Sequence, residues 1–209
     1  MKTGKLIQEL SSQLTPVKRI YPVWISFIFW IGFSFIATSL FVWNRSGNFT
    51  NIHIPVYLHE LIFILLVILS SAYIALYTSI PGNRIRNKYQ LAPVLFFILW
   101  AGSILVRSFI SNKYFILPNF SYHYCAKDII LMSLPSTSVF VFLINRRFTT
   151  NKYKMGFFVL AASACVSAIG VAFLCPNETS YHLFWIHFLP VLTLSLFGIV
   201  LSSMFFKEV

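Results

Sequence analysis

Charge is what this sequence has least of. Only 10% of its 209 residues are charged, and 16 Lys and Arg stand against 5 Asp and Glu. A soluble globular domain carries about a quarter charged residues, so this chain could not cover a water-exposed surface. The mean hydropathy of +0.78 agrees with that conclusion. These values exclude a water-soluble protein and indicate that the chain folds in a lipid bilayer.

Recognisable catalytic patterns are also missing. The sequence contains no phosphate-binding loop, no Ser-His-Asp pattern and no pair of carboxylates for a proton relay within its apolar runs. Glu60 is the acidic residue that we expect near the apolar zone, whereas a transporter would carry more polar chemistry inside the membrane. The first apolar run is long enough to span a bilayer, so we expect no cleavable signal peptide. We therefore expect one membrane domain that is not an enzyme.

Six apolar runs remain, and each is read as a membrane span because a helix needs about 20 apolar residues to cross the hydrocarbon core. Only helices and closed barrels can span a bilayer, and the runs lack the period-two alternation of barrel strands. The expected fold is therefore an all-α polytopic bundle of six helices over 23–206, preceded by a cytoplasmic segment over 1–22. The fourth run is short and contains Pro135, so we expect this helix to be kinked or extended by interfacial residues. The sixth run contains Pro190. The predicted spans are 23–42, 61–80, 91–110, 129–144, 155–174 and 181–206.

Basic residues predict the orientation, since cytoplasmic loops carry an excess of Lys and Arg. Twelve of the 16 fall on one side of the predicted spans and four on the other, which predicts that both chain ends are cytoplasmic and that the protein lies in a bacterial inner membrane. The twelve predicted on the cytoplasmic side are Lys2, Lys5, Lys18, Arg19, Arg84, Arg86, Lys88, Arg146, Arg147, Lys152, Lys154 and Lys207. The four predicted outside are Arg45, Arg107, Lys113 and Lys127.

The segment before the first span has the pattern of a short amphipathic helix. Its apolar residues fall within one narrow stripe at about 100° per residue, and they are Leu6, Ile7, Leu10 and Leu14. Thr3 is placed to cap the helix, and Pro16 is placed to end it. A helix of this length is marginal alone in water. It would therefore lie on the lipid surface or bind a groove on a cytosolic partner.

Two of the three cysteines are predicted at the outer face, where the third and fifth spans end. Cys125 follows the third span, and Cys175 follows the fifth. If Pro176 is the first helical residue of the sixth span, Cys175 and His182 share one helical face. His187 lies one turn deeper, where an imidazole is costly without a partner. Cys165 lies among small residues in the fifth span and is expected to pack in the core.

Several roles are open to these residues. Cys125, Cys175 and His182 form a soft ligand set suited to copper or zinc, with His187 as a further sensing candidate. The two thiols could equally form a structural disulfide or a redox-active pair in an oxidising compartment. His182 could simply make a hydrogen bond at the membrane interface. The residue types alone do not choose among these alternatives.

Several short motifs resemble the NrsF-like family, membrane anti-sigma factors named for negative regulation of sigma-F. The start of the chain (Leu6-Ile7-x-x-Leu10, then Thr15-Pro16-Val17-Lys18-Arg19) is similar to the start of that family, and Ser79-Ile80-Pro81-Gly82 is similar to its first inner loop. The strongest likeness is Leu174-Cys175-Pro176 followed by His182, Trp185, His187 and Leu189-Pro190-Val191, which resembles the family's closing signature. Cys125 would match the family's first outer cysteine.

The resemblance implies a regulator that holds an extracytoplasmic-function sigma factor at the cytoplasmic face and does not bind nucleic acid itself. It also implies release of that partner when a metal or an oxidant acts at the outer cysteines. Two other functions remain open from the residues. One is a small redox or haem-quinone protein that uses His59, His182 and His187, and the other is a structural accessory subunit.

Overall fold

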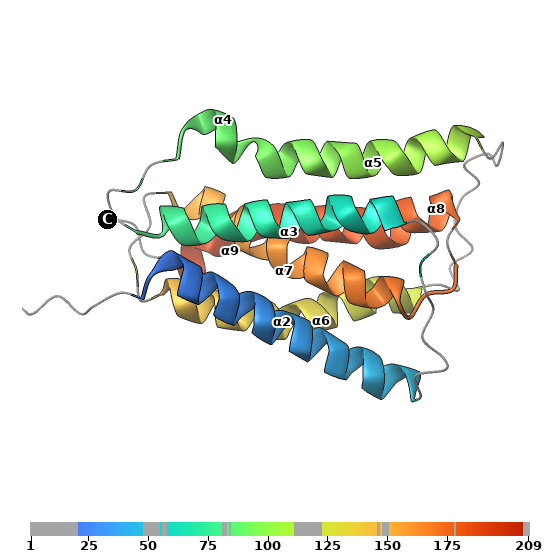
Figure 1. Ribbon diagram of the computed structural model, residues 1–209, viewed down its shortest axis with the longest axis horizontal. Coiled ribbons are helices and arrows are strands. Elements are labelled where there is room, and N and C mark those ends of the chain that lie inside the picture. Colours follow the sequence, from blue (N-terminus) through green and yellow to red (C-terminus); the bar gives the residue numbers. More distant parts are fainter. Residues whose placement is uncertain are drawn as a thin grey trace, which may run out of the picture.

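The computed structural model describes residues 21–47, 55, 58–80, 83, 85–110, 123–145, 147, 151–177 and 179–206, and every regular element in these ranges is helical (Figure 1). The predicted amphipathic helix with Leu6, Ile7, Leu10 and Leu14 lies outside the described residues. In chain order the elements are α2 (Val23–Ser46), α3 (Leu58–Thr78), α4 (Asn87–Gln90), α5 (Ala92–Ile110), α6 (His123–Ile144), α7 (Lys152–Ala172), α8 (Ser180–His182), the π-helix η3 (Leu183–Phe188) and α9 (Leu189–Phe205).

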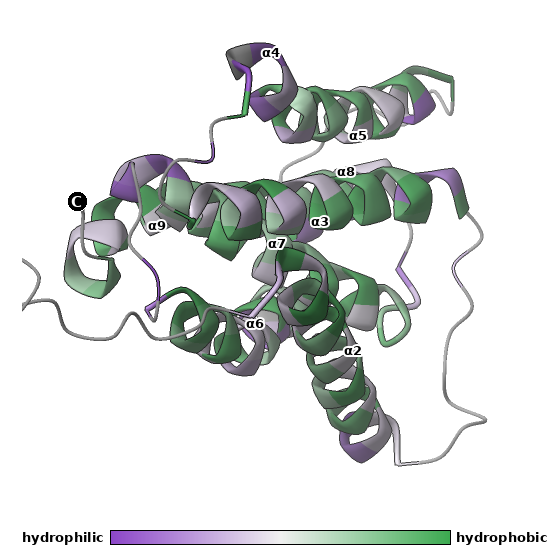
Figure 2. Cartoon of the chain, turned by 60° about the vertical axis from the view of Figure 1, so that its left-hand side comes forward, coloured by the Kyte–Doolittle hydropathy of each residue, from purple (hydrophilic) through white to green (hydrophobic). Residues whose placement is uncertain are grey.

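Among the described residues, six helical spans are long and apolar enough to cross a membrane, in agreement with the expected all-α fold of six spans. α8, η3 and α9 together form the sixth span, and Figure 2 shows apolar residues along the helices with polar ones mainly near their ends. Successive spans run in opposite directions. We call the end that holds Cys125 and Cys175 the cysteine end and the opposite end, with Tyr21 and Phe206, the basic end.

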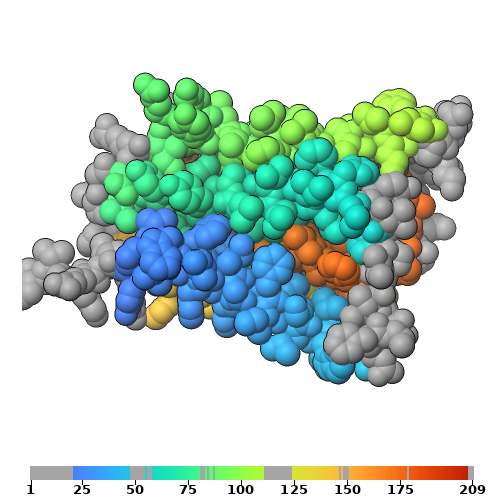
Figure 3. Space-filling model, in the orientation of Figure 1, coloured from blue at the N-terminus to red at the C-terminus, as the bar shows by residue number. Residues whose placement is uncertain are grey.

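The α7 helix forms the centre of the bundle. In its most apolar window 83% of the residues are buried, against 22–44% in the other five spans. Those five expose large apolar side chains around α7, as expected of surfaces that face lipid. Figure 3 shows α2, α3 and α5 side by side across one face of the bundle. Cys165 is fully buried in α7 among Ala162, Ala164 and Ala168, which confirms its expected place in the core.

Small residues let α7 and α9 approach closely. A Cβ atom added to Gly156 of α7 would overlap the carbonyl group of Gly198 in α9, and the reverse substitution would overlap the carbonyl group of Gly156. Close backbone contact between small residues is the usual way that helices pack when no water drives them together. This crossing fixes α9, and with it the two histidines that precede α9, against the central helix.

Two expectations concern helix starts at the cysteine end. The fourth span is extended by interfacial residues, as one of the two expected outcomes for this short run, because α6 begins at His123 and continues through Pro135 to Ile144. The polar residues before Ile129 are helical, and Asp128 among them is buried at 9% exposure. Pro176 does not start the sixth span, since the helix begins at Ser180 with Thr179 as its N-cap.

Candidate metal and thiol site

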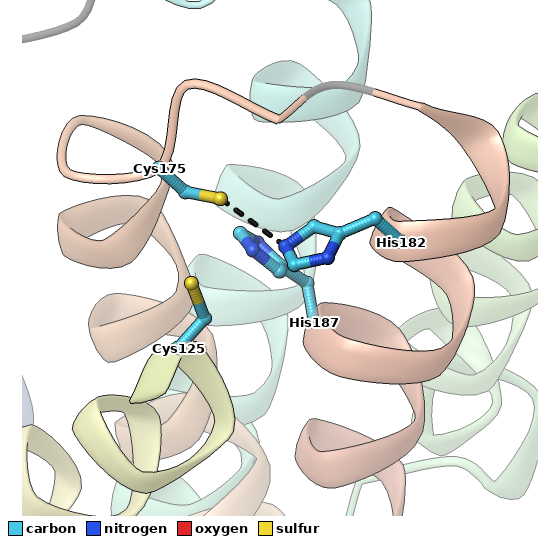
Figure 4. A group of neighbouring side chains, drawn as sticks. All are labelled: Cys125, Cys175, His182 and His187. Carbon is cyan, nitrogen blue, oxygen red and sulfur yellow. Dashed lines mark hydrogen bonds between the residues drawn. The ribbon is translucent and has the colours of Figure 1, made fainter. Parts of the chain in front are cut away.

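Four side chains meet at the cysteine end of the bundle. Cys125, Cys175, His182 and His187 each offer one sulfur or nitrogen atom, and these four atoms lie within 4.8 Å of one another. Figure 4 shows them pointing toward a common centre from three places in the chain. Cys125 comes from the first turn of α6, Cys175 follows α7, and the histidines come from α8 and η3. The structure thus brings together all four residues that the sequence singled out.

Cys175 is held by the end of α7. The last turn of that helix tightens, so that the N–H of Leu174 and the N–H of Cys175 both donate to the carbonyl oxygen of Val171 at 2.9 Å. Such tightening satisfies carbonyl groups that a helix end would leave without partners. The chain then turns away, and the Cys175 side chain is only 4% exposed.

His182 is held by a short, capped helix. The side chain of Thr179 accepts a hydrogen bond from the His182 N–H at 3.4 Å, and Asn177 Oδ1 accepts one from the Thr179 N–H at 3.1 Å. Side-chain oxygens at these positions satisfy the free N–H groups of a helix start. The His182 ring then reaches back to Cys175, with Nε2 at 3.1 Å from Sγ.

The π-helix η3 explains how His187 joins the same cluster. In an α-helix, residues five apart point about 140° away from each other, whereas i→i+5 hydrogen bonding in a π-helix places them about one turn apart. The rings of His182 and His187 meet edge to face, with centroids 5.2 Å apart. Pro190 follows directly and cannot donate to the carbonyl group of Ile186, which favours the local change of register.

Hydrogen bonding changes the acidity of Cys175. The Cys125 thiol has the largest effect, and with His182 and His187 it holds the pKa of Cys175 far below the ordinary value of 9.0, although burial acts in the opposite direction. These contacts favour the thiolate form of Cys175. A thiolate is the form of cysteine that binds metals and attacks electrophiles, so the site is prepared for either chemistry.

The donor set fits a bound zinc or copper(I) ion. Two sulfurs and two imidazoles are a common tetrahedral set for zinc, and soft thiolates also suit copper(I). With Zn–S near 2.3 Å and Zn–N near 2.0 Å, the ligand atoms of such a site lie roughly 3.3–3.8 Å apart. The four ligand atoms lie within 4.8 Å of one another, close to this spacing. The His187 Nε2 atom is buried without a hydrogen-bond partner among the described residues, a cost that is typical of functional sites.

The two cysteines are free thiols in the structure. Their sulfur atoms lie within 4.8 Å of each other, whereas a disulfide bond is about 2.05 Å long. The two sulfur atoms must therefore come closer before a disulfide can form.

A buried ion pair supports the site from α3 and α5. Arg107 donates from Nη1 to Glu60 Oε1 at 2.8 Å and from Nε to the Ser180 hydroxyl at 3.1 Å, and so anchors the start of α8. Both side chains of the pair are largely buried, at 13% and 8% exposure. A cavity of about 30 Å³ lies between this pair and the site and is lined by Glu60, Trp100, Cys175 and His187.

Sequence reasoning found the four residues but missed how they are connected. It expected Glu60 as the acidic residue near the apolar zone, yet Asp128 is also buried and lies one turn from Cys125 in α6. It did not anticipate the pairing of Glu60 with Arg107. The signal for η3 was present, because two histidines five residues apart, followed by Pro190, cannot share one face of an unbroken α-helix. His59 is not among the four clustered residues.

Comparison with known proteins adds an independent finding. No curated protein and no solved structure matches the chain. A family model described as negative regulator of sigma F matches residues 10–207. That range includes all six membrane-length helices and all four residues of the candidate site. The chain therefore belongs to the NrsF family, the negative regulators of sigma F.

Proposed function

We propose that this protein is an inner-membrane anti-sigma factor that binds an extracytoplasmic-function sigma factor at its cytoplasmic basic end. A metal ion or an oxidant at Cys125, Cys175, His182 and His187 triggers release of the sigma factor. Membership of the NrsF family implies a sigma-factor partner and a regulatory rather than an enzymatic role. The sensing role is carried by one observation, the convergence of four soft ligand atoms within 4.8 Å in a largely buried cluster.

The two forms of the signal act on the same atoms. Zinc or copper(I) would bind the two sulfurs and the two imidazoles, with His182 and His187 both supplied by the sixth span. Hydrogen peroxide would instead take two electrons from the two thiols and form a Cys125–Cys175 disulfide, while the peroxide and the two thiol protons become two waters. The low pKa of Cys175 favours both reactions, because the thiolate is the attacking and the ligating form.

The sigma factor is held at the other end of the bundle, so release requires two arrangements of the helices that differ in affinity for it. Moving the population from mostly bound to mostly free takes about 5.5 kcal/mol of differential binding. Leu6, Ile7, Leu10 and Leu14 are proposed as the binding stripe, since an amphipathic helix can bind a groove on a partner. They lie directly before the first span, so movement of that span would displace them.

Affinity purification of the full chain from its own membranes tests the proposal. The detergent-solubilised protein is expected to co-purify with a sigma factor, and addition of zinc or peroxide is expected to elute it. A Cys125→Ser variant is the matched control, because it should retain the sigma factor under both treatments. Recovery of the intact protein without any sigma factor would contradict the anti-sigma role. Elution from the Cys125→Ser variant would contradict the assigned site.

A further inference from the structure

Buried polar and aromatic contacts join α2 to α6, and toward the cysteine end the same face of α2 also packs on α7, where Thr38 and Val42 lie beside Gly170. The buried residues of α2 recur every four positions and form one seam, and they are Ser26, Trp30, Ser34, Thr38 and Val42. Near the middle of this seam, Trp30 Nε1 donates to the carbonyl oxygen of Ser136 at 3.1 Å. The Ser34 and Ser136 hydroxyls share a hydrogen bond of 2.8 Å. All three residues are fully or almost fully buried.

Arg147 closes the seam at the basic end, three residues after α6. Its side chain is buried at 5% exposure, although the charge pattern counts it with the basic residues of a cytoplasmic loop. Nη2 donates to the Tyr21 carbonyl oxygen at 3.1 Å and to the Ser26 hydroxyl at 2.6 Å, both in or next to α2. Nη1 donates to the Leu76 carbonyl oxygen and to the Ser79 hydroxyl, each at 3.2 Å, at the end of α3.

One guanidinium therefore joins three parts of the bundle, because each of its two outer nitrogens serves a different helix. All four acceptors are neutral oxygens. A charged donor strengthens each hydrogen bond, but the junction lacks the stronger attraction of a buried ion pair. The hydrogen bonds of Arg147 to α2 or to α3 can therefore break without leaving a buried carboxylate unpaired. Tyr21 comes seven residues after Leu14, the last residue of the stripe that we propose binds the sigma factor.

The same pair of helices carries one member of the sensing site. Cys125 is in the first turn of α6, whereas Cys175, His182 and His187 all come from the α7–α9 hairpin. Near Cys125, Asp128 of α6 lies 3.8 Å from Arg45 of α2, so the two helices also meet at the cysteine end. A contraction of the site would move Cys125 and the α2–α6 pair together against the hairpin.

We propose that α2 and α6 move together as one body and so carry the signal across the membrane. Arg147 is the junction at the basic end, where this movement displaces Tyr21 and, with it, the sigma-binding stripe that precedes Tyr21 in the chain. This inference rests on the proposed function and adds its regulation. Formation of the metal site or the disulfide pulls Cys125 toward Cys175 at one end. At the other end, the α2–α6 pair shifts relative to α3, and the four hydrogen bonds of Arg147 rearrange.

Arg147→Lys tests the junction, since lysine keeps the charge but cannot present two separate nitrogens to two helices. We expect the ratio of sigma-dependent reporter output with and without zinc to fall at least about fivefold, the lower limit for a typical coupling between sites. Zinc binding by the purified variant should stay within about twofold of the wild type. Trp30→Phe combined with Ser34→Ala should lower the same ratio, because it removes the mid-membrane contacts.

Arg86→Lys is the matched control, because Arg86 is an exposed basic residue at the same end of the bundle and should leave the ratio unchanged. Normal induction in Arg147→Lys, with normal membrane levels, would overturn the proposal. A wild type that gives no induction with either zinc or diamide would contradict the proposed function instead. If zinc does not induce the reporter, the ratio of reporter output is measured with and without diamide, an oxidant of thiols. Normal induction by diamide in Arg147→Lys would then overturn the proposal.

Distance measurement gives a second, independent readout. Ketone-bearing residues in place of Trp24 of α2 and Tyr73 of α3, both exposed on the bundle surface, allow spin labelling without touching the native cysteines. Zinc is expected to shift the distance between the labels in an otherwise native chain, and to leave it unchanged in Cys125→Ser. A zinc-bound protein with an unchanged distance would show that α2 does not move relative to α3 and would overturn the proposal.

Discussion

The Sγ atom of Cys175 lies 3.1 Å from Nε2 of His182, although seven residues and a turn of the chain separate them. A thiol next to an imidazole loses its proton more easily, because the imidazole and other donors stabilise the thiolate. The Cys125 thiol contributes most to this stabilisation, and the pKa of Cys175 is lowered as a result. Reactivity at this pair therefore depends on a residue from a different helix.

The pH dependence of alkylation tests that arrangement. Because the pKa of Cys175 lies far below 9.0, the thiolate fraction is constant near neutral pH, and the rate constant for its reaction with iodoacetamide should be flat between about pH 6 and 8. Cys125→Ala removes the main stabilising hydrogen bond and raises the pKa. The rate should then increase by up to about tenfold per pH unit, as the thiolate fraction does below the pKa.

Mass spectrometry of the modified peptides separates Cys175 from the other thiols in that experiment. The slope against pH is the decisive quantity, since altered access to the buried site changes the absolute rate but not its pH dependence. Cys165→Ser is the matched control and should leave the slope flat. A tenfold rise per pH unit in the unaltered protein would mean that Cys175 has an ordinary pKa.

Metal binding is expected to need both histidines. The purified protein should bind one zinc ion, and His182→Ala or His187→Ala should each weaken binding by at least about tenfold, because each removes one of four ligands. Cobalt(II) gives a further test, since its visible spectrum distinguishes tetrahedral thiolate sites. His59→Ala is the control and should bind normally. Equal zinc affinity in His187→Ala would restrict the site to the three remaining residues.

Hydropathy was sufficient to predict most of the fold. Val23 was predicted as the first residue of a span and Ile110 as the last residue of another, and both are ends of helices in the structure, because Pro22 precedes Val23 and polar residues follow Ile110. Hydropathy alone placed the start of the fourth span at Ile129, whereas the polar residues before it are helical. The burial of Asp128 depends on its contact with Arg45 in α2, which a window of local sequence cannot include.

The candidate site shows the same limit. Cys175 and His182 were predicted to share a helical face beginning at Pro176, yet their contact arises from a capped turn at Thr179. The addition of His187 depends on the π-helical register, and the place of Cys125 depends on how α6 packs against α7. Residue type could identify ligands, whereas their convergence depends on packing between helices that are distant in sequence.

Orientation in the membrane follows from the distribution of basic residues and stays a prediction. Reporter fusions after Asn87, Lys152 and Val209 are expected to report the cytoplasm, because Lys and Arg near the spans are retained on that side. Fusions after Asn48, Asn119 and Glu178 are expected to report the outside. A consistent reversal at any one of these six positions would contradict the topology of six spans with both ends inside.

The amphipathic stripe before the first span is expected to bind the sigma factor. Replacing Leu6 and Leu10 with Ser removes roughly 2–5 kcal/mol of apolar contact if both side chains are buried in a groove. Sigma-dependent transcription should then become constitutive while the membrane domain still inserts at normal levels. Gln8→Ser is the matched control on the polar face of the same helix. Unchanged repression in the double variant would indicate that the sigma factor binds the basic loops and not this stripe.

The two outer cysteines decide between a sensor and a structural bond. Serine is nearly isosteric with cysteine but cannot form the thiolate, so each substitution removes the chemistry and preserves the shape. In a sensor, Cys125→Ser and Cys175→Ser should each keep the sigma factor bound and fail to release it on exposure to metal or oxidant. The double variant should match either single one, because residues that act as one unit are not additive.

A structural disulfide predicts a different result from the same variants. Loss of the bond should lower the amount of protein in the membrane and raise sigma-dependent output without any signal, since removal of a native disulfide typically costs about 2–5 kcal/mol. Reporter output with and without the stressor, measured beside membrane levels, separates the two. Cys165→Ser should change neither, because that thiol is buried within α7 away from the site. Normal induction in both single variants would exclude these cysteines from sensing.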